Sequence, residues 1–375
     1  MLTCQCTTKE GKACTKKCSK KPYHDKRYCW QHQTCNIKKR KKNNILKYNA
    51  LIGTGTYGCV FKPPLKCRYQ KDFDTTYSGD IMKLMRENVM ALDEEEVSRV
   101  VRKADPHSNY FLPLVGNKCL IDTEKEVDEI KKCNRYDRDT DKSLYRGFFI
   151  KYGGVTLYDY IYNNPNKALI NINNMWNIMH HLIKGLNLLQ KLGIMHLDIK
   201  INNIVVDNNN VPKFIDFGFA TFVDSFEYVN AKKGVYYQIY PLFYSVLQAN
   251  SIKQLYDTYE QNLIDVDAYF KQPFVKNSHT DFVKIYYDKA GFTNAKNFEY
   301  FNAVVKPNLF KMDINSLFDM FYQYIIKNTN VDFGYQNMDL YLRIFRLIMY
   351  CIHPNVDEQY DMNRILLYIK NSQMH

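Results

Sequence analysis

The residues best suited to chemistry lie between positions 194 and 218, in the sequence IMHLDIKINNIVVDNNNVPKFIDFG. Asp198, Lys200 and Asn203 lie close together in this segment, and Asp216 follows a second short apolar run. A carboxylate can take the proton of an attacking hydroxyl, a lysine can neutralise a phosphate, and carboxylate and amide oxygens are hard ligands for Mg2+. The combination predicts a phosphoryl-transfer site, with Asp198 as catalytic base and Asn203 and Asp216 as the Mg2+ ligands.

The spacing H-x-D-x-K-x-x-N followed by D-F-G resembles the catalytic and metal-binding loops of eukaryotic-type protein kinases. The resemblance covers residues 48–370 and implies an α+β, bilobal protein-kinase-like fold. A small β-rich lobe with the hinge would span residues 48–152, and a large helical lobe residues 153–375. The resemblance also implies ATP and Mg2+ as cofactors and a protein substrate. Lys200 favours a serine/threonine kinase, because tyrosine-specific loops usually lack this lysine.

A glycine-rich segment with the pattern G-x-G-x-x-G precedes these motifs and is flanked by strand-like runs. Glycine lets the backbone approach phosphate oxygens without interference from a Cβ atom. Since no helix follows, the segment resembles the kinase glycine-rich hairpin rather than a dinucleotide-binding turn. The resemblance implies that ATP is contacted by Ile52, Gly53, Gly55, Gly58 and Val60.

Lys83 lies in a short strand-like run and takes the place of the family's lysine that contacts the α- and β-phosphates. Residues 94–102, EEEVSRVVR, predict a helix with an apolar stripe. Alignment of this helix makes Glu96 the expected partner of Lys83. Glu94 and Glu95 remain alternatives.

Residues 148–154 resemble the interlobe hinge. In this resemblance Ile150 is the gatekeeper, and the backbone around Lys151 and Tyr152 meets the adenine. The residues expected to bind the nucleotide outside the glycine-rich segment are then Lys83, Glu96, Lys151, Tyr152 and Asp216.

The expected large lobe combines a buried helix with departures from the family pattern. Residues 174–192 place apolar side chains at spacings of three and four, typical of a buried helix. Asp313 resembles the aspartate that holds the catalytic loop from beneath. Leu197 replaces an arginine that pairs with activation-loop phosphate in many kinases, so we expect activity that does not require that phosphate. Residues 243–310 form an insertion that contains no motif.

The N-terminal segment has its own composition, because six of the 11 cysteines lie in the first 35 residues. Residues 1–36 resemble short Cys3His modules of large DNA viruses, and the expected structural Zn2+ ligands are Cys6, Cys14, Cys29 and His32. Cys4, Cys18 and Cys35 are alternative ligands, and a disordered basic tail is the alternative to a folded module. Elsewhere the scattered cysteines predict reduced thiols.

The positive charge is concentrated in the same region. Residues 1–47 hold 14 Lys or Arg and two acids, which is +12 of the formal net charge of +13. This segment, which includes a basic linker at residues 37–47, could attract an acidic or nucleic-acid partner. No stretch of about 18 apolar residues occurs, and residues 1–11 are too polar for a signal peptide. We therefore expect no membrane partner and an intracellular location.

Together these features resemble the serine/threonine kinases of giant DNA viruses, which implies the host cytoplasm, the virion or the nucleus as the location. Two other functions compete with this hypothesis. In the first, the chain is an ATP-binding pseudokinase that acts as an interaction scaffold; the retained Lys83, Asn203 and Asp216 weigh against it. In the second, it is a small-molecule phosphotransferase, which Lys200 disfavours.

Overall fold

The computed structural model describes residues 50–55, 58–68, 81–124, 127–163, 171–228, 241, 243–244, 247, 298–327, 337–353 and 356–372. The chain divides into two compact units, Met1–Tyr48 and Asn49–His375, and the described residues belong to the second. The predicted zinc ligands, the basic linker and most of the predicted insertion therefore lie outside the described residues.

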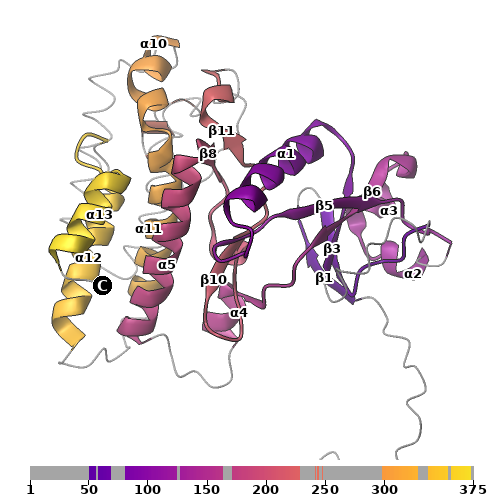
Figure 1. Ribbon diagram of the computed structural model, residues 1–375, viewed down its shortest axis with the longest axis horizontal. Coiled ribbons are helices and arrows are strands. Elements are labelled where there is room, and N and C mark those ends of the chain that lie inside the picture. The colour runs from indigo at the N-terminus through magenta and orange to yellow at the C-terminus, as the bar shows by residue number, and fades with distance from the viewer. Residues whose placement is uncertain are drawn as a thin grey trace, which may run out of the picture. The chain divides into compact units, whose positions relative to one another are not determined.

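A five-stranded antiparallel sheet forms the first part of this unit (Figure 1), with the order β1-β2-β3-β6-β5. Its side chains alternate between the two faces of the sheet, and buried apolar residues pack on both. The strands are β1 (Ala50–Thr54), β2 (Gly58–Lys62), β3 (Ile81–Arg86), β5 (Leu114–Cys119) and β6 (Tyr145–Ile150).

Helix α1 (Val89–Ala104) packs on this sheet, mainly against β5. It begins at the N-cap Asn88, whose side chain accepts a hydrogen bond from the backbone N–H of Ala91. The sequence predicted a helix from residue 94, so the structure adds its first five residues. The run of acids from residue 94 is consequently inside the helix, not in its first turn.

Two short helices, α2 (Val127–Ile130) and α3 (Asn134–Arg138), lie between β5 and β6. Cys133, the N-cap of α3, forms a disulfide with Cys59 of β2, and Cys67 forms one with Cys119 of β5. The prediction of reduced thiols was therefore wrong for these four cysteines. Their separations of 74 and 52 residues carry no pairing signal in the sequence, because the pairs meet only through strand pairing and core packing.

The second part of the unit is mainly helical. Helix α5 (Ile172–Lys191) confirms the predicted buried helix and packs against α11 (Phe310–Lys327), beside which it lies in Figure 1. Its apolar stripe joins the largest buried cluster of the described residues. The other helices of this part are α4 (Leu157–Tyr162), α10 (Phe298–Tyr300), α12 (Met338–Cys351) and α13 (Met362–Asn371).

A second sheet, of order β4-β10-β9-β7, carries the segment that the sequence analysis singled out. Strand β10 pairs in parallel with β4 and antiparallel with β9, so the ends of the two apolar runs lie side by side. A separate pair joins β8 to β11. The strands are β4 (Phe111–Leu112), β7 (Val155–Thr156), β8 (Ile194–Met195), β9 (Ile204–Val206), β10 (Pro212–Ile215) and β11 (Thr221–Phe222).

Within the ranges described above, no helix is both long and apolar enough to cross a membrane.

Candidate active site

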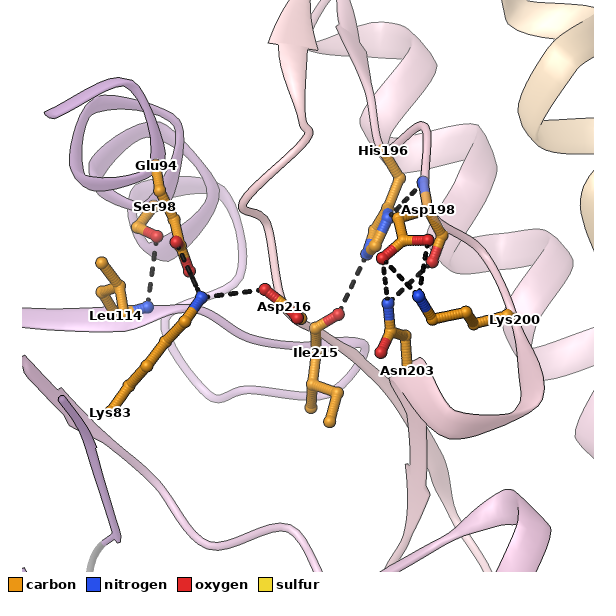
Figure 2. Close-up of polar contacts among 10 residues, drawn as sticks. All are labelled: Lys83, Glu94, Ser98, Leu114, His196, Asp198, Lys200, Asn203, Ile215 and Asp216. Carbon is orange, nitrogen blue, oxygen red and sulfur yellow. Dashed lines mark hydrogen bonds and ion pairs between the residues drawn. The ribbon is translucent and has the colours of Figure 1, made fainter. Parts of the chain in front are cut away.

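The buried Lys83 of β3 links the five-stranded sheet to helix α1 and to the loop after β10 (Figure 2). Lys83 Nζ lies 2.7 and 2.8 Å from the two carboxylate oxygens of Glu94 and 2.9 Å from Asp216 Oδ1. Burial alone would lower the pKa of Lys83, but the two carboxylates outweigh it and raise that pKa. Lys83 is therefore held as an ammonium ion at the point where three elements meet.

The expected pairing of Lys83 with Glu96 was wrong, and Glu94 is the partner. The Glu94 side chain is 3% exposed, whereas that of Glu96 is 61% exposed and lies 3.9 Å from Arg99. Successive residues of an α-helix are rotated by about 100°, so positions 94 and 96 lie on nearly opposite faces. Glu94 shares its face with the buried Val97 and Val101, which fixes it toward the sheet.

Asp198, Lys200 and Asn203 form a second polar group on the loop before β9 (Figure 2). Lys200 Nζ lies 2.9 Å from both Asp198 carboxylate oxygens, and Asn203 Nδ2 donates to Asp198 Oδ2 at 2.7 Å and to its backbone oxygen at 2.9 Å. Asp198 is almost fully buried, while the Lys200 side chain is 42% exposed. The carboxylate is thus held by hydrogen bonds from Asn203 and contacts the more exposed ammonium group of Lys200.

Asp313 of α11 holds this loop from below, as the sequence predicted. Its carboxylate accepts hydrogen bonds from the backbone N–H groups of His196, at 2.6 Å, and Leu197, at 2.8 Å. Burial raises the pKa of Asp313, and the two N–H donors offset this only in part. Leu197 itself has a φ of 60°, a conformation that costs free energy in a non-glycine residue and persists only when its surroundings impose it.

His196 connects the two polar groups, a role the sequence analysis did not assign. Its Nε2 atom lies 3.1 Å from the backbone oxygen of Ile215, the residue before Asp216. Asp216 has a φ of 63° and so also adopts a strained backbone conformation. Burial would raise the pKa of Asp216, but Lys83 lowers it on balance, so the carboxylate is ionised at neutral pH.

The glycine-rich hairpin is formed by β1 and β2, with Ile52, Gly53, Gly58 and Val60 in the strands and Gly55 between them. The loop is closed by a hydrogen bond of 2.8 Å from Gly55 N–H to the Gly58 oxygen. A Cβ atom at Gly58 would lie 2.4 Å from the Leu84 oxygen, so only glycine lets β2 lie this close to β3. At Gly55 the nearest such contact is 3.6 Å, which leaves room beside the loop.

The predicted hinge, residues 148–154, begins within β6 and continues past its end. Ile150 is nearly buried at the end of this strand, and Lys151 and Tyr152 are exposed. Lys62 Nζ from the end of β2 lies 3.0 Å from the centroid of the Tyr152 ring, a cation–π contact between the hinge and the glycine-rich hairpin. At Gly153 a Cβ atom would lie 2.1 Å from Leu112 and 2.6 Å from Val205, so the hinge backbone packs closely on the second sheet.

The side chains present fit a divalent cation. Both hydrogen bonds of the Asn203 amide leave from Nδ2, which keeps its Oδ1 oxygen available as a ligand, and Asp216 contributes an ionised carboxylate. Two oxygen ligands with substrate phosphates and water suit Mg2+, which rarely uses an all-protein cage. The described residues contain no cluster of three or more His, Cys, Asp or Glu able to hold a metal.

Comparison with known proteins independently supports the resemblance to protein kinases. Residues 138–317, just under half of the chain, match the family model of the protein kinase domain. This match includes Asp198, Asn203 and Asp216 but begins after Lys83 and Glu94. The match supports a eukaryotic-type protein kinase.

The curated relatives are protein kinases at low identity. The chain is 26% identical over 176 residues to cyclin-dependent kinase-like 4 of Mus musculus, which covers 46% of this chain and 43% of that protein. It is 27% identical over 179 residues to the probable cyclin-dependent kinase 9 of Caenorhabditis elegans. That alignment covers 45% of this chain and 31% of the relative. It is 25% identical over 183 residues to the MAP kinase kinase kinase win1 of Schizosaccharomyces pombe, covering 48% and 11%. The chain thus spans less than half the length of each of these relatives.

Proposed function

We propose that this chain is a serine/threonine protein kinase that transfers the γ-phosphate of ATP to a hydroxyl group of a protein. The observation that carries the proposal is the position of Asp198, whose buried carboxylate is held by Asn203 and lies against the more exposed Lys200. An isolated buried carboxylate would have no such orientation. A carboxylate fixed beside a lysine and two Mg2+ ligands is suited to receive a hydroxyl proton next to a transferring phosphate.

Residues of both lobes would bind ATP. Gly53, Gly55 and Gly58 would let backbone N–H groups approach the phosphates, and Lys83, fixed by Glu94, would bind the α- and β-phosphates. Ile52 and Val60 would cover the adenine, and the backbone of Lys151 and Tyr152 would meet its edge. Asn203 and Asp216 would hold Mg2+, which would neutralise charge on the phosphates.

In the transfer step, Asp198 would orient the Ser or Thr hydroxyl and receive its proton. The hydroxyl oxygen forms a bond to the γ-phosphorus as the bond from that phosphorus to the bridging oxygen of ADP breaks. Lys200 would neutralise the γ-phosphate during this exchange. Positioning and electrostatic stabilisation account for most of the catalysis in phosphoryl transfer, and Asp198 and Lys200 would contribute to both.

We also propose that residues 1–36 form a separate zinc module through Cys6, Cys14, Cys29 and His32. The support is the sequence pattern alone. A chelator should release about one Zn2+ per chain, and Cys29→Ser should do the same. Phosphate transfer should be unchanged in both cases if the module is separate from catalysis, while a loss of transfer would show that the two are coupled.

The direct experiment for the main proposal is transfer of labelled phosphate from ATP with Mg2+ to a basic protein and to the chain itself. Phosphoserine or phosphothreonine should form with the wild type and not with Asp198→Ala. Phosphotyrosine alone would contradict the proposed specificity. ATP binding without transfer to any acceptor would favour the scaffold hypothesis.

A further inference from the structure

Four consecutive acids, Asp93 to Glu96, lie in α1, yet only Glu94 meets Lys83. A rotation of the helix by about 100° would exchange Glu94 for a neighbouring carboxylate. The charges of these acids therefore do not select the partner of Lys83, although the apolar stripe of Val97 and Val101 on α1 favours Glu94. Polar contacts between α1 and the sheet would add to this stripe in setting the rotation of the helix about its axis.

The sheet provides a second lysine on the same face as Lys83. Phe148 of β6 pairs with Lys83 of β3 on one side and with Lys118 of β5 on the other. Directly paired residues point to the same face of a sheet. Lys83 and Lys118 thus flank Phe148 in one row beneath α1, and Lys118 Nζ lies 5.8 Å from the centre of the Phe148 ring.

Lys118 binds the carboxylate next to Glu94. Its Nζ atom lies 3.0 Å from Glu95 Oε2 and 2.7 Å from Glu87 Oε1, and Glu87 also lies 3.3 Å from Arg146 Nε. The side chains of Lys118, Glu87 and Glu95 are each between a quarter and a third exposed. Such a partly buried, charge-balanced network holds its geometry better than an isolated surface pair.

Two further contacts lie on the same stripe of α1. Ser98 Oγ accepts a hydrogen bond of 3.1 Å from Leu114 N–H, as Figure 2 shows, and Arg102 Nη1 donates one of 2.5 Å to the Leu114 oxygen. Glu95, Ser98 and Arg102 are spaced by three and four residues, so they face the same strand. This stripe attaches α1 to β5 along about two turns of the helix.

Strand β5 has an irregularity where Arg102 contacts it. The strand pairing shifts between Leu114 and Lys118, where Gly116 has a φ of 95°. A Cβ atom at Gly116 would lie 2.6 Å from Arg102 Nη1 and 2.7 Å from its Nη2. Glycine at this irregularity therefore lets the guanidinium group reach the strand.

We propose that Lys118, with Gly116 and the α1 stripe Glu95–Ser98–Arg102, is a positioning device that sets the rotation of α1 so that Glu94 faces Lys83. Lys118 is not among the residues proposed to bind nucleotide or acceptor, and it would act through Glu95. The inference rests on the proposed kinase function, because it concerns the residues that hold Lys83 for ATP.

The test compares Lys118→Met with Lys132→Met, which removes a lysine from an exposed ion pair with Glu129 elsewhere in the same lobe. Lys118→Met should raise the KM for ATP and lower kcat, with a combined loss of about threefold to tenfold in kcat/KM. The KM for the protein acceptor should stay unchanged, since Lys83 and Glu94 do not contact the acceptor. Lys118→Arg should recover most of the activity. Gly116→Ala should cause a similar loss, because its Cβ atom would collide with the guanidinium group of Arg102.

Hydrogen exchange gives a readout that needs no activity. Amides of α1 should exchange about threefold to tenfold faster in Lys118→Met than in Lys132→Met, while those of α5 stay unchanged. Equal exchange of α1 in both variants, or equal acceleration in α1 and α5, would overturn the inference. If the wild type transfers no phosphate, the proposed function fails, but the exchange comparison still decides whether Lys118 positions α1.

Discussion

Glu94 Oε1 lies 2.7 Å from Lys83 Nζ, while Glu96, two residues further along the same helix, faces solvent. This pair is nearly inaccessible to water, and Lys83 is also bound to Asp216. A charge that loses its partner in such an environment is strongly destabilised. The identity of the buried glutamate is therefore the part of the site most sensitive to the rotation of α1.

We predict that Glu94→Gln lowers phosphate transfer by about 10- to 100-fold, because Lys83 loses the carboxylate that fixes it toward the phosphates. Glu96→Gln should stay within about twofold of the wild type, as expected for an exposed residue. Steady-state kinetics on both variants measures the difference. A larger loss in Glu96→Gln than in Glu94→Gln would instead support the pairing of Lys83 with Glu96.

We predict that Asp313→Ala destabilises the protein by about 3–5 kcal/mol. The reason is that two buried backbone N–H groups, those of His196 and Leu197, lose their acceptor. Urea unfolding monitored by fluorescence gives the free energy of unfolding. Asp319→Ala, on the exposed side of the same helix, is the matched control. A similar small effect for both variants would mean that Asp313 does not support the loop.

The disulfides lead to a third prediction. In the chain-entropy account, a cross-link between Cys59 and Cys133 stabilises the folded state by about 4 kcal/mol, because it closes a long loop in the unfolded chain. Reductant should therefore lower the midpoint of guanidinium unfolding. In the double variant Cys59→Ser with Cys133→Ser, reductant should lower the unfolding midpoint less than in the wild type. Of the two bonds among the described residues, only Cys67–Cys119 would then remain to be reduced. Linked peptides containing Cys59 and Cys133 should appear after digestion without reductant; their absence would contradict this pairing.

The fourth prediction concerns pH. The hydrogen bond from Lys118 lowers the pKa of Glu87 below its usual value of 4.5. The folded state therefore holds the ionised form more strongly than the unfolded state, so this contribution to stability is present above pH 4.5 and is lost as the pH falls toward the folded pKa. The difference in Tm between the wild type and Glu87→Gln should shrink from pH 6 to pH 3. A constant difference over that range would show that the charge of Glu87 is not responsible.

The motifs of the active site were predictable because their chemistry is local in sequence. Asp198, Lys200 and Asn203 lie on one loop, and their mutual hydrogen bonds require little from the rest of the fold. Helix α5 was also predictable, since its apolar residues repeat with the helical period.

The features that the sequence did not reveal depend on long-range contacts. Glu94 and Glu96 are chemically identical, and they differ in lying on or off the buried face of α1, which is set by Val97, Val101 and the contacts with β5. The start of α1 depended on the Asn88 cap, which a stricter search for N-cap residues could have found. The partners of Cys59 and Cys67 follow from strand pairing and core packing, for which the sequence offers no local sign.

The most direct test of the central claim is phosphate transfer from ATP by the wild type and by Asp198→Ala, with Mg2+-ATP binding followed by thermal shift in both. We expect transfer to Ser or Thr by the wild type, at least about 1000-fold less by the variant, and a similar thermal shift in the two proteins. Equal transfer by the two proteins would contradict the role of Asp198. A wild type that binds Mg2+-ATP and transfers no phosphate to any acceptor would contradict the proposed kinase activity.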